Sequence, residues 1–267
     1  FHYHRNLKEI HIPENVKYIG NASFYHCDNL ENVVISDKVS DIDHNAFMGT
    51  KWLENYPDDF VIAGDGVVLR YKGNEKEVMI PEGVKVIKTS SFPYNRKIER
   101  IIIPASVKVV EWNCFSMCYV LEQIQLIHEN GKIFTWNLKR TPAKNKISDT
   151  LTLLIQKKFN DVWWIDDCIK YPCIMDYYFD TDDKETGEYF RSHSHDFIFQ
   201  FIQDGDLFHL QRFAENTNGI TSDNIDMYID IAIERTQTGG SLELQMYLMD
   251  YKATHFGFFN PEEFFKL

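Results

Sequence analysis

Six apolar positions recur at a fixed period through the first half of this chain and constrain its fold more than any other feature. The first copy consists of Leu7, Ile10, Ile12, Val16, Ile19 and Phe24. The same pattern returns 23 residues later from Leu30 to Phe47, and again from Ile98 to Phe115. A period of this length indicates units that bury their apolar faces against one another, so the first half is predicted to form a solenoid. A solenoid presents a binding surface rather than a reaction pocket.

Each copy is predicted to contain one short strand. Apolar residues two apart within a copy, such as Ile10 and Ile12, are typical of a strand with one buried face. Parallel strands in one ladder are therefore expected at residues 8–12, 31–35, 76–80, 99–103 and 122–126. Pro13, Pro81 and Pro104 follow the buried pair and end the strand, because proline cannot donate a ladder hydrogen bond. The second apolar pair of each copy marks the return leg.

An insertion separates the second and third copies. The third strand begins 45 residues after the second, which is one period plus 22 residues, and the extra residues lie at about 52–73. Within them, apolar segments at 60–63 and 67–71 flank a Gly-Asp-Gly turn, which favours a β-hairpin. We expect this hairpin to project from the solenoid. The fifth copy loses its pattern near Gly131, so a leucine-rich β-solenoid of about five units is predicted over residues 1–135.

Two patterns within the copies resemble a known repeat family. The first is Cys27-x-x-Leu30-x-x-Val33-x-Ile35, which returns as Cys118-x-x-Leu121-x-x-Ile124-x-Leu126; the second is Ile-Pro-x-x-Val-x-x-Ile, followed by Ser or Ala and Phe. Both are similar to BspA-like leucine-rich repeats. The resemblance implies a right-handed, slightly curved solenoid, whose relatives are mostly bacterial surface or secreted proteins concerned with adhesion and protein binding. His4 and Asn95 replace the cysteine, Ser36 the proline and Glu75 the leucine of the pattern, which leaves the ligand open.

Helical spacing replaces the strand pattern after Pro142, and residues 142–267 are predicted to form an all-α domain. Leu151, Leu154 and Ile155 show the spacing of one buried helix face. Helices are expected at residues 148–159, 161–179, 184–203, 206–216, 222–235 and 241–251. We expect helices of this region to cap the open end of the solenoid, which otherwise exposes apolar strand edges.

The last three predicted helices contain a second, weaker repeat. Its positions are Leu210, Phe213 and Ala214, which recur 34 residues later as Leu244, Tyr247 and Leu248. This recurrence resembles an ankyrin-type unit, although the Thr-Pro-Leu-His signature of that unit is missing. A generic helical bundle or hairpin stack is the alternative.

Composition limits the classes of partner and the compartment. The formal charge of −12 lies mostly in the second half, and neither half holds clustered Lys and Arg, so no nucleic-acid partner is predicted. No segment approaches the ~20 apolar residues of a membrane span. Five scattered cysteines favour reduced, buried thiols over a disulfide scaffold. The chain begins at Phe1, inside a repeat, so the compartment stays open between the cell surface or secretion, which the resemblance implies, and the cytoplasm.

No motif in the sequence specifies catalysis, and no catalytic residue, metal site or cofactor is predicted. The segment His193–Asp196 carries good metal ligands, but its two histidines are two residues apart and point to different sides of a helix. The acidic segment 180–185 lacks the glycine and glutamate of an EF-hand loop and is interpreted as a helix-capping linker. Cys114 and Cys118 are interpreted as buried core thiols, since Cys118 occupies the repeated cysteine position.

The candidate ligand-binding residues face away from the predicted core. One side chain of each strand points outward between the two buried ones, and stacking of the copies forms a first row of His11, Val34, Met79, Ile102 and Gln125. A parallel second row consists of Glu9, Asn32, Glu77, Arg100 and Gln123. The first row is apolar at its centre, and exposed apolar side chains in a line are typical of a protein contact. Coverage of the first row by the helices or by the inserted hairpin is the alternative.

Two functional hypotheses follow from these observations. The leading one is a non-enzymatic interaction or adhesion module, which binds a protein or glycan ligand through the repeat surface. The alternative is an intracellular scaffold in which the acidic helical domain is the functional surface. A third class, an enzyme built around His193 and His195, would require a bound metal.

Overall fold

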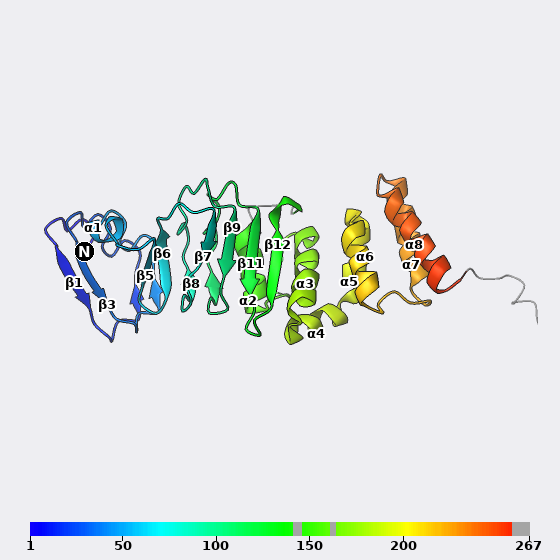
Figure 1. The fold of residues 1–267 in the computed structure, drawn as a ribbon, viewed down its shortest axis with the longest axis horizontal. Coiled ribbons are helices and arrows are strands. Elements are labelled where there is room, and N and C mark those ends of the chain that lie inside the picture. Colours follow the sequence, from blue (N-terminus) through cyan, green and yellow to red (C-terminus); the bar gives the residue numbers. More distant parts are fainter. Residues whose placement is uncertain (141–145, 161–163, 258–267) are drawn as a thin grey trace, which may run out of the picture. The chain divides into compact units, whose positions relative to one another are not determined.

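Residues 1–140, 146–160 and 164–257 are described in a computed structural model of the chain (Figure 1). They divide into two compact units. The first comprises Phe1–Ile165 together with Phe179–Asp182, and the second comprises the remaining described residues from Asp166 onward.

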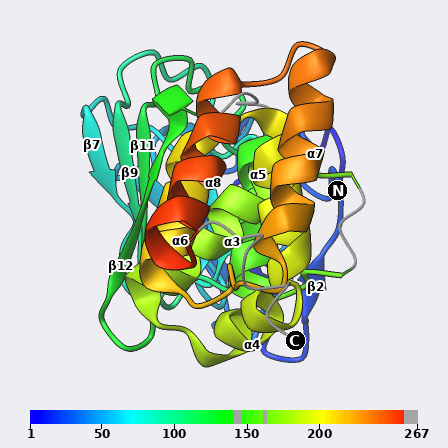
Figure 2. The same cartoon turned by 90° about the vertical axis from the view of Figure 1, so that its right-hand side faces the viewer.

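The first unit is a solenoid with strands on two opposite sides (Figure 2). On one side the predicted strands pair in parallel and in the predicted register, with Ile101 between Val78 and Ile124. These strands are β1 (Glu9–Ile12), β3 (Asn32–Ile35), β7 (Glu77–Met79), β9 (Arg100–Ile103) and β11 (Gln123–Ile127). They belong to two separate sheets, one of β1 and β3 and the other of β7, β9, β11 and β12. The prediction of one continuous ladder is therefore wrong at the insertion.

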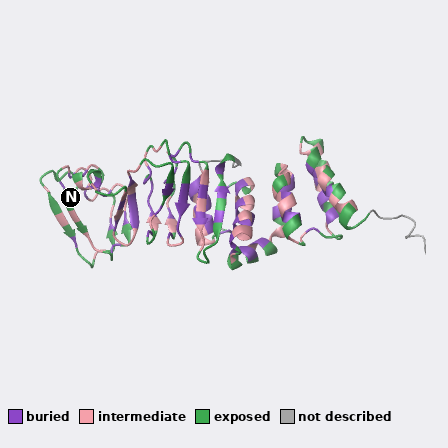
Figure 3. Ribbon diagram, in the orientation of Figure 1, coloured by how far each residue is buried: buried purple, intermediate pink, exposed green. Residues whose placement is uncertain are grey.

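The return legs form short strands on the opposite side of the first unit. They are β2 (Tyr18–Ile19), β4 (Asp41–Ile42), β8 (Val86–Ile87) and β10 (Val109–Val110). β2 pairs with β4, and β8 pairs with β10, both in parallel. The apolar residues of the two sets of strands are mostly buried, and the remainder are half-buried; Figure 3 colours these segments of the ribbon purple and pink. The core therefore runs along the solenoid as the repeat pattern predicts.

The insertion forms one additional turn of the solenoid rather than a projection. It contains α1 (Lys51–Glu54) and the predicted antiparallel hairpin of β5 (Phe60–Ala63) and β6 (Val67–Tyr71). β6 also pairs in parallel with β8, and its residues Val67 and Val68 are fully buried. The expected projection is wrong because 22 residues are almost one period, so the insertion supplies a return leg of its own.

The turn of this hairpin packs directly against neighbouring backbone. Gly64 and Gly66 have φ values of 56° and 73°, in the left-handed region that favours glycine. A Cβ atom at Gly64 would lie 2.2 Å from the carbonyl oxygen of Val39, and one at Gly66 would lie 2.3 Å from that of Gly83. The amide between the two glycines donates to the same Val39 carbonyl at 2.8 Å. The Gly-Asp-Gly sequence thus allows the inserted turn to stack between its neighbours.

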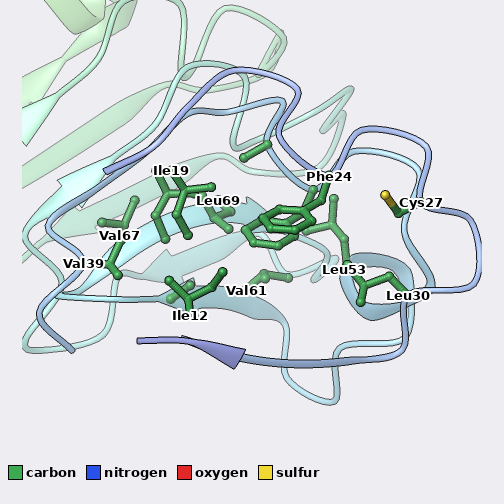
Figure 4. Packing of buried hydrophobic residues seen from close by; sticks show 14 residues of the cluster. Ile12, Ile19, Phe24, Cys27, Leu30, Val39, Leu53, Val61, Val67 and Leu69 are labelled. Atoms are coloured by element: carbon green, nitrogen blue, oxygen red, sulfur yellow. The ribbon is translucent and has the colours of Figure 1, made fainter. Parts of the chain in front are cut away.

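Aromatic side chains stack through the core of the first unit. The rings of Phe24 and Phe47 are 5.1 Å apart, and those of Phe92 and Phe115 are 5.0 Å apart. Tyr71 of β6 lies 5.3 Å from Phe92, so the inserted turn contributes a ring to this stacking. Figure 4 shows how the first two copies pack against the insertion through Ile12, Ile19, Phe24, Leu30, Val39, Leu53, Val61 and Val67.

All five cysteines are free, and four of them are buried. Burial raises the pKa of the Cys118 thiol to about 12 and that of Cys114 further still. The Cys114 Sγ also lies 3.4 Å from the Ser148 Oγ in the core. The interpretation of Cys114 and Cys118 as core thiols is confirmed, because both side chains are buried among the apolar residues of the core.

A strand and a helix close the C-terminal end of the solenoid. β12 (Ile133–Asn137) pairs in antiparallel fashion with β11 and is followed by a short 3-10 turn at Leu138–Arg140. α2 (Ile147–Gln156) covers β10, where Thr152 donates to the Val110 carbonyl at 2.7 Å. These contacts pair backbone groups that an open edge would expose, which confirms the expected helical cap for α2. The first unit therefore extends beyond the boundary predicted at residues 135–142.

The acidic linker is held on the solenoid and begins the next helix. Asn130 donates to the Thr181 carbonyl at 2.8 Å, and Lys132 pairs with Asp182 at 3.6 Å. Asp183 accepts a hydrogen bond from the amide of Thr186 at 2.8 Å and so caps α4. The interpretation of segment 180–185 as a helix-capping linker is confirmed at Asp183.

The helices after α2 are α3 (Asp167–Thr181), α4 (Lys184–Ser192), α5 (Ser194–Asp204), α6 (Leu207–Asn216), α7 (Ile225–Gln237) and α8 (Leu242–His255). The single helix predicted at 184–203 is wrong, because the chain leaves helical geometry at His193. The Ser192 hydroxyl there donates to the carbonyls of Glu188 and Tyr189, in competition with the backbone ladder. Part of the helix predicted at 161–179 falls on residues 161–163, which lie outside the described residues.

Two helical hairpins with similar turns follow α4. Gly205 ends α5 with a φ of 68°, and Asp206 then caps α6 by accepting from the amide of His209. Gly239 has a φ of 95°, and Ser241 caps α8 in the same way. α5 packs against α6 and α7, and α7 packs against α8. The arrangement is a hairpin stack, and the ankyrin-type resemblance stays a prediction.

A half-buried polar cluster joins α3 to α6 within the second unit. The His209 Nδ1 lies 2.5 Å from Asp206 Oδ2, and its Nε2 lies 3.3 Å from Asp176 Oδ2. Arg212 also donates to Asp176. Burial alone lowers the pKa of His209, but hydrogen bonds to Asp176 and Asp206 raise it to about 9. His209 is therefore predominantly charged at neutral pH.

We expect the helical unit to lose stability between about pH 6.5 and pH 9. Because the folded pKa of His209 exceeds its ordinary value, its contribution is complete below about pH 6.5 and disappears as pH rises through about 9. The loss is about 2 to 3 kcal/mol and is measured by urea unfolding, followed by circular dichroism at 222 nm. His209→Gln should flatten this pH dependence, and an unchanged slope in that variant would contradict the assignment.

Candidate functional site

The structure brings six of the ten candidate residues together on one sheet. Met79, Ile102 and Gln125 of the first row lie side by side on β7, β9 and β11, and β12 extends this row with Thr135. In the second row, Glu77, Arg100 and Gln123 lie side by side, and β12 adds Asn137. The remaining four residues, Glu9, His11, Asn32 and Val34, lie together on the separate sheet of β1 and β3. The two rows are therefore each divided into two parts.

Ile102 is not exposed as predicted. Its side chain is 9% exposed, whereas Met79 beside it is 64% exposed. The difference follows from position in the sheet, because β7 is an edge strand and β9 has paired strands on both sides. Met79 on β7 and Gln125 on β11 are the register partners of Ile102, so their side chains flank it on both sides. Cross-strand neighbours of this kind cover one another. Ile102 therefore supports this face rather than offering a contact.

The second row lines a polar hollow on the sheet of β7, β9, β11 and β12, which we call the four-stranded sheet. Its lining residues are Lys76, Glu77, Glu99, Arg100, Glu122, Gln123, Asn137 and Lys139. Three ion pairs between neighbouring segments hold the side chains around the hollow. They join Lys76 with Glu99 at 2.6 Å, Arg100 with Glu77 at 2.7 Å, and Lys139 with Glu122 at 2.7 Å. The hydrogen bond that the Lys76 ammonium donates to the Glu99 carboxylate raises the pKa of Lys76. Because these pairs are exposed, they position side chains more than they stabilise the fold.

Gln123 holds an unpaired acceptor in this hollow. Its Oε1 is buried, and among the described residues no donor lies within hydrogen-bond distance of it. Buried polar atoms in proteins almost always have a partner, so each exception calls for an explanation. Because Gln123 lines the polar hollow, an N–H or O–H group of a ligand would supply the missing donor once the side chains that cover the Oε1 move.

Five of the eight lining residues were missed by the sequence analysis. Three of them, Lys76, Glu99 and Glu122, lie in one column at the same 23-residue period and directly precede the second row. That period could have identified them. Asn137 and Lys139 lie in and after β12, which the repeat pattern does not cover.

The histidines of the segment His193–Asp196 have separate partners. The His193 Nδ1 lies 2.9 Å from the Tyr189 carbonyl oxygen, and the His195 Nδ1 lies 3.1 Å from the Tyr228 hydroxyl. Within the described part of the chain, no three His, Cys, Asp or Glu side chains gather as a metal site would require. None of the described helices is both long and apolar enough to cross a membrane.

Comparison with known proteins identifies the repeat. The sequence profile for the BspA-type leucine-rich repeat region, in six copies, matches residues 1–61 and 68–161. The chain belongs to the BspA-type leucine-rich repeat family. The BspA-type match extends through α2, in agreement with the extent of the first unit, and covers the inserted turn except at residues 62–67.

One solved structure is also similar to this BspA-type chain. It is a leucine-rich cell surface protein from Faecalibacterium prausnitzii, at 20% sequence identity and a TM-score of 0.24. The match covers 47% of this chain and 61% of that one, so it spans less than two thirds of the neighbour. None of the curated proteins matches the chain.

Proposed function

We propose that this chain is a non-enzymatic interaction module that binds a protein or glycan ligand through the outward face of β7, β9, β11 and β12. The observation that carries the proposal is the buried, unpaired Oε1 of Gln123 in the polar hollow. On the same face, Met79 lies two residues from Glu77 of the hollow and is 64% exposed, and Ile133 at the far end of β12 is 46% exposed. An apolar contact next to an unsatisfied acceptor combines the two terms that protein recognition uses.

The test compares the two sheets that share the first row. Met79→Glu places a charge on the proposed face, and Val34→Glu places the same charge on the separate sheet, where Val34 is 55% exposed. Binding is measured against a panel of purified extracellular-matrix proteins and glycans. We expect Met79→Glu to weaken binding roughly 10- to 100-fold and Val34→Glu to leave it within about threefold.

Gln123→Leu tests the unpaired acceptor separately. Since the acceptor has no partner among the described residues, its removal should not lower the free energy of unfolding, whereas binding should weaken about tenfold. Binding that is indifferent to both Met79→Glu and Gln123→Leu would remove this face from consideration.

A scaffold role of the helical unit is the second candidate. Its support is a set of exposed apolar side chains on the last two helices, which consists of Met227, Leu242, Met246 and Met249. Met227 also lines a shallow hollow on α7 together with Asp230 and Glu234. A chain cleaved after Ile165 that retains all binding in the panel would exclude this candidate.

A further inference from the structure

A second hollow, with basic character, neighbours the polar hollow along the chain, since its lining residues Asn74 and Lys97 precede Lys76 and Glu99 by two residues. Three segments meet there: the end of α1, the end of β6 with the residues that follow it, and the loop between β8 and β9. Its charged lining residues are Arg70, Lys72, Arg96, Lys97 and Glu54. Four cations and one carboxylate are unusual in a chain with a formal charge of −12. We call this site the basic hollow.

The positive charge of the basic hollow is largely uncompensated. The Lys72 ammonium donates to the Tyr56 carbonyl and lies 3.4 Å from the Glu54 carbonyl oxygen, so neutral backbone groups hold it in place. Arg70 pairs with the only carboxylate of the lining, that of Glu54, at 2.8 Å. Among the described residues, no acidic side chain pairs with Arg96 or Lys97, and both are exposed. Fixed and unneutralised cations in a concave site attract anionic groups.

The loop that carries Arg96 and Lys97 is held in a defined position. The Asn95 Oδ1 accepts from the amides of Lys97 and Ile98, both at 3.0 Å. Its Nδ2 donates to the Gly73 carbonyl at 3.4 Å, next to Lys72. Asn95 stands where the repeat pattern has cysteine, so this copy departs from the pattern at the residue that organises the loop. Such an arrangement reduces the ordering cost of binding.

Tyr94 adds an exposed aromatic ring to the basic hollow. Its side chain is 74% exposed, although its backbone has a φ of 48°. The equivalent position has a positive φ in each earlier copy, at Tyr3 (58°), His26 (51°) and Gly49 (78°). A tyrosine here gains little from burial and takes a backbone conformation that costs about 1 kcal/mol relative to glycine. The positive φ is thus a feature of the repeat, and what distinguishes Tyr94 is an exposed ring in the lining of a hollow with four cations.

We propose that the basic hollow binds an acidic polysaccharide. Carboxylate or sulfate groups would pair with the Arg96 guanidinium, which can bind two oxygens at once, and with the Lys97 ammonium, while Arg70 and Lys72 add positive charge to the site. The ring of Tyr94 would stack against the C–H face of a sugar, which a peptide of acidic residues does not offer. The basic hollow and the polar hollow have different lining residues, so variants can address the two sites separately.

The experiment measures binding of the whole chain to heparin, hyaluronan, neutral dextran and poly-glutamate by titration calorimetry. Heparin tests sulfate groups and hyaluronan tests carboxylate groups. We expect at least one of these two to bind, with affinity falling about tenfold between 50 and 200 mM salt, and dextran to show no binding. Absence of binding to both, or equally tight binding of poly-glutamate, would overturn the proposal.

Matched variants then locate the site. Arg96→Ala with Lys97→Ala should weaken polysaccharide binding at least tenfold, whereas Lys17→Ala with Lys38→Ala, which removes two exposed cations elsewhere, should change it less than threefold. Tyr94→Gly should weaken binding about fivefold while thermal unfolding stays near that of the wild type, because glycine suits a positive φ. Met79→Glu should have no effect, which separates this site from the four-stranded sheet. Equal binding by both double variants would refute the basic hollow.

Discussion

Phe92→Ala should lower the free energy of unfolding of the solenoid by about 3 to 5 kcal/mol. Phe92 is 1% exposed and lies between the rings of Phe115 and Tyr71, at 5.0 and 5.3 Å. Truncation removes contacts to the fourth copy and to the inserted turn at once, and the cavity cannot collapse while the strands stay paired. All five tryptophans precede Ile165, so tryptophan fluorescence during guanidinium unfolding reports on this unit alone.

The control for this prediction is Tyr119→Ala, which removes an aromatic ring that is 56% exposed. It should change the same free energy by less than about 0.5 kcal/mol. If Phe92→Ala cost less than about 1 kcal/mol, the stacking of Phe92 on Tyr71 would not bridge the inserted turn and the third copy as the structure indicates.

The period alone predicted the core of the solenoid, because the complete copies place apolar side chains at the same positions and bury or half-bury them. The period did not predict structure where the pairing of a neighbouring strand, rather than the repeat pattern, determines how a segment folds. The insertion carries no copy of the signature, yet β6 pairs with β8 because the backbone edge of β8 needs a partner. β12 closes the edge of β11 for the same reason. The unpaired backbone N–H and C=O groups of a strand edge favour pairing with another strand, and the pattern of side chains does not predict this pairing.

The candidate site was predicted in part for a related reason. Strand alternation correctly assigned Glu77, Arg100 and Gln123 to one face, since it depends only on the backbone. The exposure of Ile102 depends on how many strands flank it, and this number follows from the division of the sheets. The basic hollow joins β6 to a loop between β8 and β9, and its cations share no spacing in the sequence.

Lys88→Met should lower the free energy of unfolding by about 3 kcal/mol. The Lys88 side chain is 7% exposed and donates to Asp41 at 3.0 Å and to Glu111. Burial lowers the pKa of Lys88, but its bonds to Glu111 and Asp41 raise it above the ordinary value, so the ammonium stays charged. It joins the second copy to the fourth across the inserted turn. Methionine keeps the volume of the side chain but leaves both carboxylates without their cation.

The chain offers a matched control, because Lys76 and Glu99 form a pair with the same 23-residue separation as Lys88 and Glu111. Lys76 is 73% exposed, so Lys76→Met should cost less than about 1 kcal/mol. In a double-mutant cycle, Lys88→Met with Glu111→Gln should cost less than the two changes added, since the second removes the carboxylate that the first leaves unpaired. Strict additivity, or equal losses for Lys88→Met and Lys76→Met, would show that the buried pair does not couple copies across the inserted turn.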